Sequence, residues 1–121
     1  MQRVFEKYNP QIVINAAAHK YVPLMETNCI EAIENNMFGT KTVVDLCEEY
    51  NAEKFIMVST DKAVNPTNVM GRATKRMCKM IVQSASTYGN VKHSATRFGN
   101  ILGSAGSVIP LFKRQIVSGV R

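Results

Sequence analysis

The chain of 121 residues contains no tryptophan, only two histidines and three cysteines, and no long hydrophobic run. Cys29, Cys47 and Cys78 lie far apart without a CxxC pair, which indicates reduced thiols rather than a disulfide framework. Such sparse histidines and cysteines exclude a metal site with ordinary ligand spacing. The apolar runs fall far short of the roughly 20 residues that a membrane span needs, and no secretory signal is visible. We therefore expect a cytoplasmic protein without a bound metal.

The chain also lacks the charge pattern of a nucleic-acid-binding protein. Its net charge is +6, but lysine and arginine are scattered, with no run longer than two and no aromatic residues between them. A basic face with interleaved aromatics is the usual footprint of nucleic-acid binding. We expect a solvated basic surface with a few anion contacts, and no nucleic-acid partner.

Short apolar segments alternate with helical patterns along the whole chain. Strands are predicted near residues 11–15, 54–59 and 94–98, and helices near 1–8, 27–51, 67–88 and 108–118, with a break near Asn35 and Asn36. This alternation predicts an α/β fold with a parallel sheet. Cys47 and Cys78 are expected in the core, and Glu48 on a water-facing side. The predicted core stripe of the 67–88 helix is Met77, Met80, Ile81 and Ala85.

The most informative segment is Ser59–Gly71, which directly follows the buried strand pattern of residues 55–58. In open α/β sheets, active sites lie just beyond the carboxyl ends of the strands. The hydroxyl of Thr60, the carboxylate of Asp61 and the ammonium of Lys62 therefore arrive together where a catalytic site is expected. The alternative is a plain strand-end turn, in which Thr60 and Asp61 bond the backbone and Lys62 is solvated.

Several motifs occur in order: Asn15–Lys20, Val22–Glu26, Asn36 with Gly39–Thr40, Ser59–Gly71, Arg97–Asn100 and Gly106–Gln115. Together they resemble the extended short-chain dehydrogenase/reductase superfamily, and more narrowly its UDP-N-acetylglucosamine 4,6-dehydratases of polysaccharide biosynthesis, which serve capsule, O-antigen and glycan sugars. The resemblance implies a Rossmann domain that binds NAD or NADP, a smaller domain that holds the UDP-sugar, and a homo-oligomer. Membrane association of the intact protein stays open.

The chain lacks the G-x-G-x-x-G turn that normally opens a dinucleotide-binding domain. We therefore expect a partial Rossmann fold, a doubly wound parallel sheet without its N-terminal glycine-rich βαβ unit. By the resemblance, residues 1–100 form the C-terminal half of the Rossmann domain, and residues 101–121 begin the substrate-binding region. The chain alone is expected to be inactive.

The resemblance also implies catalytic roles. Thr60 would bond the C4 oxygen of the sugar, Asp61 would act as acid and Lys62 as base in the loss of water. Met70 corresponds to the tyrosine of a Y-x-x-x-K pair and cannot exchange a proton. Met70 and Lys75 are separated by one residue more than in the family pattern M-G-A-T-K, which places them about 140° apart on a regular helix rather than about 40°. The extra residue is absorbed before the helix or forms a π-bulge. If Lys75 keeps its place in the pattern, Gly71 takes the tyrosine position.

The remaining implied contacts surround the same edge of the sheet. Asn36 either organises the site or simply breaks a helix. The backbone N–H groups before the last helix suit a diphosphate. Cofactor contacts are expected from Ala16, Ala17, Ala18, Lys75 and Phe98, and substrate contacts from His19, Lys20, Asn100 and Ser107.

Two other functions compete with dehydration. A UDP-sugar epimerase of the same superfamily can share the 4-keto intermediate without eliminating water. A catalytically inactive fragment or pseudoenzyme is favoured by the missing glycine turn and by the extra helix residue. The pair Asp61–Lys62 and the missing tyrosine favour the dehydratase.

Overall fold

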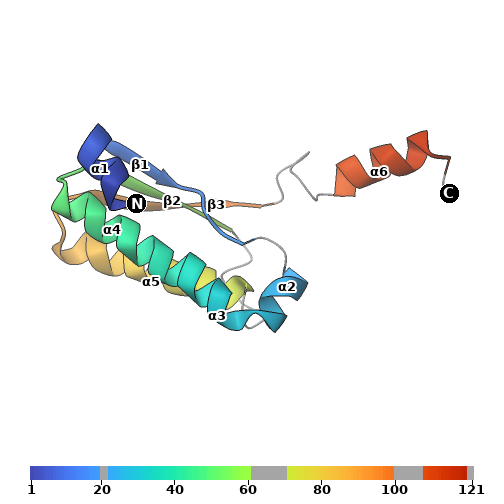
Figure 1. Cartoon of the computed structure of the whole chain (residues 1–121), viewed down its shortest axis with the longest axis horizontal. Coiled ribbons are helices and arrows are strands. Elements are labelled where there is room, and N and C mark those ends of the chain that lie inside the picture. Colours follow the sequence, from blue (N-terminus) through green and yellow to red (C-terminus); the bar gives the residue numbers. More distant parts are fainter. Residues whose placement is uncertain (20–21, 61–70, 100–107, 120–121) are drawn as a thin grey trace.

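The strands form one parallel sheet in the order β1-β2-β3 (Figure 1). The computed structural model describes residues 1–19, 22–60, 71–99 and 108–119. The strands are β1 (Ile12–Asn15), β2 (Lys54–Thr60) and β3 (Lys92–Phe98), with β2 paired in parallel to both neighbours. The predicted α/β class and the three predicted parallel strands are confirmed.

The helices cover one face of this sheet. Figure 1 shows α4 and α5 side by side against it, while α6 stands apart from the sheet and its helices. None of the described helices is both long and apolar enough to cross a membrane. The helical elements are α1 (Gln2–Tyr8), α2 (Val22–Thr27), α3 (Cys29–Ala32), the π-helical turn η1 (Ile33–Phe38), α4 (Gly39–Glu49), α5 (Gly71–Tyr88) and α6 (Val108–Val117).

The core lies between the sheet and the two helices α4 and α5. Successive side chains of a strand point to opposite faces, so Phe55 and Met57 of β2 enter the core and are fully buried. On the uncovered face, Ile12 and Ile14 of β1 stay exposed. Burying a side chain such as Phe55 contributes about 1.5–3 kcal/mol. The helices contribute Val44, Leu46, Cys47, Cys78, Val82 and Ala85 to the same cluster.

The predicted core stripe of α5 is partly wrong. Met77 and Met80 are 41% and 52% exposed, whereas Cys78 and Val82 are buried. Each helical residue is rotated by about 100° from the one before it, so a stripe centred on Cys78 turns Met77 outward. The buried-thiol prediction for Cys47 and Cys78 is confirmed, and Ala85 is also buried as expected.

The long helical segment predicted over residues 27–51 differs at its start and in its middle. Helical structure already begins at Val22, and the break expected near Asn35 and Asn36 is the π-helical turn η1. The start was missed although Pro23 fits the first turn of a helix, where its missing N–H costs nothing. Residues 67–70, predicted as the start of α5, lie outside the described residues.

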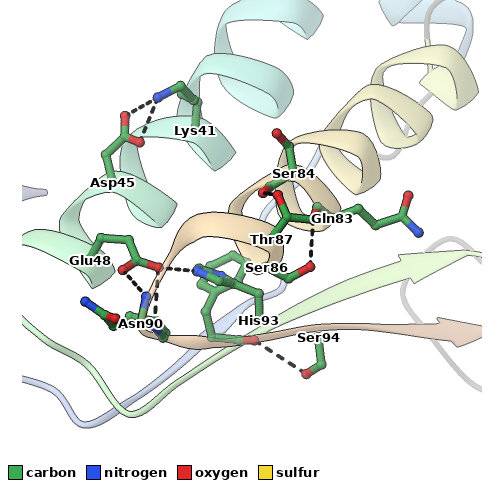
Figure 2. A network of polar contacts seen from close by, with 12 residues as sticks. Lys41, Asp45, Glu48, Gln83, Ser84, Ser86, Thr87, Asn90, His93 and Ser94 are labelled. Atoms are coloured by element: carbon green, nitrogen blue, oxygen red, sulfur yellow. Dashed lines mark hydrogen bonds and ion pairs between the residues drawn. The ribbon is translucent and has the colours of Figure 1, made fainter.

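The sequence predicted Glu48 on a water-facing side, but the structure shows this residue only partly exposed. Its side chain is 27% exposed and its carboxylate lies 2.7 Å from Nε2 of His93. The same carboxylate accepts hydrogen bonds from the backbone N–H of Asn90 at 3.0 Å and of Val91 at 3.4 Å. Figure 2 shows this network between α4 and the start of β3. It closes the end of the sheet opposite to the carboxyl ends of the strands.

Candidate functional site

The carboxyl ends of the three strands meet at one edge of the sheet, where Asn15, Thr60 and Phe98 are the last strand residues. Thr60 and Phe98 are register partners at the ends of β2 and β3. The helix α5 begins near this edge and brings Lys75 to it. The arrangement places the sequence-predicted Thr60 and Lys75 at the position where α/β proteins bind ligands.

Lys75 is held beneath the ends of β1 and β2. Its Nζ lies 3.4 Å from the carbonyl oxygen of Ala17 and 3.4 Å from that of Val58. These are long hydrogen bonds, so the ammonium is positioned there without being tightly bound. Burial lowers the pKa of Lys75, and the neighbouring Cys78 thiol opposes that shift. The amine is therefore easier to deprotonate than an exposed lysine.

The extra residue before Lys75 does not distort the part of α5 that carries Lys75. The helix is regular from Gly71, and within the described part of α5 no π-bulge occurs. Gly71 lies one helical turn before Lys75 on this regular helix. Met70, predicted at the position of the family tyrosine, lies outside the described residues.

Asn36 connects the loop after β1 to α5. Its side chain is 1% exposed, its Oδ1 accepts a hydrogen bond from the backbone N–H of His19 at 3.1 Å, and its Nδ2 donates to Oγ1 of Thr74 at 3.1 Å. The thiol of Cys78 donates a hydrogen bond to the backbone carbonyl oxygen of Asn36 at 3.0 Å. Asn36 lies in the π-helical turn η1, where the sequence predicted a helix break, and its side chain joins the loop after β1 to Thr74, the residue before Lys75.

A second buried amide fixes the loop after β1. Asn15 is 9% exposed, and its Nδ2 donates to Oγ1 of Thr40 at 3.2 Å while its Oδ1 accepts from the backbone N–H of Ala17 at 3.1 Å. Sequence reasoning gave Asn15 no role of its own. The burial of Asn15 follows from the register of the sheet. Asn15 pairs with Met57, whose side chain faces the helices, so the Asn15 amide also points into the protein.

The other predicted contacts have mixed surroundings. Ala16 and Ala17 are exposed, which leaves their backbone open to a ligand, and Ala18 is half-buried. The imidazole of His19 lies 3.3 Å from the carboxylate of Glu31, so it already has a partner. Phe98 is 45% exposed on the uncovered face of the sheet.

Six predicted site residues cannot be placed by the structure. They lie outside the described residues and are Lys20, Asp61, Lys62, Met70, Asn100 and Ser107. Among the side chains that the structure does describe, no group of three or more histidine, cysteine, aspartate or glutamate residues could hold a metal ion.

Sequence comparisons point to one family. Residues 1–121 match the sequence profile described as "Polysaccharide biosynthesis protein". The chain is 52% identical over 119 residues to the probable polysaccharide biosynthesis protein EpsC of Bacillus subtilis, covering 98% of this chain and 20% of that protein. It is 44% identical over 109 residues to a UDP-N-acetylglucosamine 4,6-dehydratase (inverting) of Campylobacter jejuni, covering 88% of this chain and 33% of that enzyme.

An epimerase is also similar in sequence. A UDP-glucose 4-epimerase of Rickettsia rickettsii is 42% identical over 109 residues, covering 88% of this chain and 32% of that enzyme. The solved UDP-glucose 4-epimerase of Thermus thermophilus, in complex with NAD, matches with a TM-score of 0.84 at 19% identity, covering 98% of this chain and 45% of that chain. This likeness shows a shared Rossmann fold. The chain spans a fifth to a third of the length of these curated relatives.

Proposed function

Because the chain belongs to the polysaccharide biosynthesis protein family, we propose that it is part of a UDP-N-acetylglucosamine 4,6-dehydratase that uses NAD or NADP. The observation that carries this proposal is the position of Lys75 beneath the carboxyl ends of β1 and β2, at the same edge as Thr60. In this proposal, residues 1–100 are the C-terminal half of a Rossmann domain, and residues 101–121 begin the region that binds the sugar.

The residues at this edge fit a nicotinamide cofactor. Exposed Ala16 and Ala17 leave room for close approach to the backbone, and Lys75 offers an ammonium beside them. These residues would hold the cofactor, which would supply the hydride chemistry between C4 and C6 of the sugar. The chain's own residues hold the reactants and move the protons.

Three successive residues are assigned to the sugar, one to its C4 oxygen and two to the proton transfers. The hydroxyl of Thr60 bonds the C4 oxygen, which orients the sugar as a ketone forms there. A C4 ketone acidifies the C5 proton, which the amine of Lys62 removes, while the carboxyl of Asp61 donates a proton to the departing C6 hydroxyl, so that water leaves and a C5–C6 double bond forms. Addition of the hydride at C6 is then balanced by return of a proton from the Lys62 ammonium to C5. Each such positioned acid or base contributes about 10²–10⁴-fold to the rate.

Epimerisation is the alternative that a specific observation favours, because the Rickettsia rickettsii relative is named UDP-glucose 4-epimerase. An epimerase needs no acid for the C6 hydroxyl, and the product keeps that hydroxyl. Residues Asp61 and Lys62 would then have no assigned step. The two reactions differ in the atoms they change, so one assay separates them.

The test uses an intact protein that contains this segment, incubated with UDP-N-acetylglucosamine in deuterium oxide. Proton NMR reads the C5 signal and the appearance of a C6 methyl group separately. A C6 methyl signal with solvent deuterium at C5 supports the dehydratase. Inversion at C4 with C6 and C5 unchanged would establish the epimerase instead.

A further inference from the structure

Between α5 and the end of β3 lies a hollow of about 350 Å³ whose lining is rich in cations. Ser59 and Arg97 are register partners on β2 and β3, so their side chains share the sheet face that the helices cover. From α5, side chains at helical spacing complete the wall. The described residues that line it are Ser59, Thr60, Arg76, Lys79, Met80, Gln83 and Arg97.

The three cations of this hollow have no anionic partner in the described part of the chain. Ion pairs there join His19 to Glu31, Lys41 to Asp45 and His93 to Glu48 only. Arg76, Lys79 and Arg97 are absent from all of them, and no carboxylate is among the described residues that line the hollow. Lys79 is half-buried rather than fully solvated. Like charges gathered around a concave surface repel one another and raise the local concentration of anions.

The donors in this hollow suit the oxygens of a phosphate group. Two guanidinium groups can each bond two oxygens in a fork, and an ammonium adds a compact charge. The hydroxyl of Ser59 and the amide of Gln83 add neutral hydrogen-bonding groups to the same wall. The volume lies at the lower end of the roughly 300–1,000 Å³ typical of small-molecule sites. This space exceeds what a bare ion needs and admits a small phosphate ester.

We propose that the hollow lined by Ser59, Arg76, Lys79 and Arg97 binds a phosphate group. Thr60 is also among the residues that line the hollow, so the site adjoins the edge of the sheet to which the proposed function assigns its chemistry. The proposal does not depend on the dehydratase assignment, because it rests on the three cations and on the lack of an anionic partner for them among the described residues. The phosphate can be free phosphate or the phosphate of a nucleotide, and the test separates these sources.

The test is a titration of the isotopically labelled chain, followed by amide chemical shifts, at constant ionic strength. The probes are inorganic phosphate and uridine 5′-monophosphate, with sodium acetate as a monovalent control. We expect saturable shifts at Ser59, Arg76 and Arg97 with either phosphate and not with acetate. Tighter binding of the nucleotide identifies a nucleotide site, and equal binding identifies a free-phosphate site. Absence of saturation with both phosphates would overturn the proposal.

Matched variants separate a built site from general attraction to a basic protein. Lys79→Gln should weaken phosphate binding about tenfold, the usual effect of losing one charged hydrogen bond. Lys92→Gln removes the same charge from the opposite end of β3, where the residue is exposed and outside the hollow, and should leave binding unchanged. Equal weakening by both variants would overturn the proposal.

A charge reversal gives a second and independent readout. Lys79→Glu puts a carboxylate in the same hollow as Arg76 and Arg97, which should raise the melting temperature and abolish phosphate binding. A lower melting temperature would show that the cations do not crowd the hollow, and would count against the proposal. Neither readout requires an active enzyme, so failure here and failure of the proposed function are distinguishable.

Discussion

The carboxylate of Glu48 on α4 lies 2.7 Å from Nε2 of His93 on β3, across 45 residues of sequence. The His93 side chain is fully buried, and the carboxylate also accepts the backbone N–H groups of Asn90 and Val91. An ionised carboxylate only accepts hydrogen bonds, so the imidazole Nε2–H donates. One side chain therefore ties α4 to the turn between α5 and β3 and to the strand itself (Figure 2).

Replacing this carboxylate should destabilise the fold. In Glu48→Gln, the amide cannot accept all the hydrogen bonds that the carboxylate accepts, and the loss should be about 1–3 kcal/mol of unfolding free energy. Urea denaturation followed by circular dichroism measures it. The control is Glu49→Gln, the exposed neighbour on the same helix, which should change stability by less than about 0.5 kcal/mol. Equal losses in both variants would contradict the assigned role.

The same group should make stability depend on pH. Burial raises the pKa of Glu48, but hydrogen bonds from His93, Asn90 and Val91 outweigh that effect, so the pKa lies below its ordinary value of 4.5. A lowered folded-state pKa gives stability that is present above the unfolded pKa and is lost as pH falls through the folded pKa. The stability difference between the parent chain and Glu48→Gln should therefore shrink below pH 4.5. A difference that stays constant down to acid unfolding would contradict this.

Gly89 should tolerate no side chain, because Glu48 occupies the space beside it. A Cβ at this position would overlap the Glu48 carboxylate and would lie 2.9 Å from the carbonyl oxygen of Ala85. Gly89→Ala therefore displaces a carboxylate that three hydrogen bonds hold, and should lower the urea midpoint. At Gly39, a Cβ would meet only the carbonyl oxygen of Glu34 at 3.8 Å. Gly39→Ala in α4 should raise stability by about 0.5–1 kcal/mol, the helix preference of alanine over glycine.

Asn36 should matter for both stability and activity. Asn36→Ala removes the acceptor of the His19 backbone N–H and the donor to Thr74, at a cost of about 1–3 kcal/mol. The loop after β1 would then lose its connection to the helix that carries Lys75, so turnover in the intact protein should fall beyond what the loss of folded protein explains. The measurements are urea denaturation and turnover per folded molecule. Glu34→Gln changes an exposed residue of the same π-helical turn and should leave both near the parental values.

Asp61 and Lys62 should carry the elimination step in an intact protein with this segment. Lys62→Ala should abolish deuterium exchange at C5, and Asp61→Asn should slow water loss while still permitting formation of the 4-ketone. Each loss should reach about 10²–10⁴-fold, as expected for a positioned acid or base. Proton NMR of the sugar reads both signals. Parental rates of dehydration in both variants would transfer the proton chemistry to Thr60 or to another part of the protein.

The sequence alone determined the parallel α/β arrangement and the edge at which functional groups gather. The apolar segments at residues 11–15, 54–59 and 94–98 alternate with helical patterns, and parallel strands joined by helices put their carboxyl ends on one side. Thr60 and Lys75 could therefore be assigned to one edge without a structure. The local spacing of apolar residues was enough for this assignment, because that spacing repeats within each strand and each helix.

Only the tertiary structure decided which side of each element faces the core and which distant groups meet. Periodicity gave α5 an apolar stripe but not its rotation, and packing on Cys78 and Val82 left Met77 exposed. The contact of Glu48 with His93, and that of Asn36 with Thr74, span 45 and 38 residues and leave no local pattern in the sequence. Such pairs form because burial makes an unpaired polar group costly, and burial is a property of the folded chain.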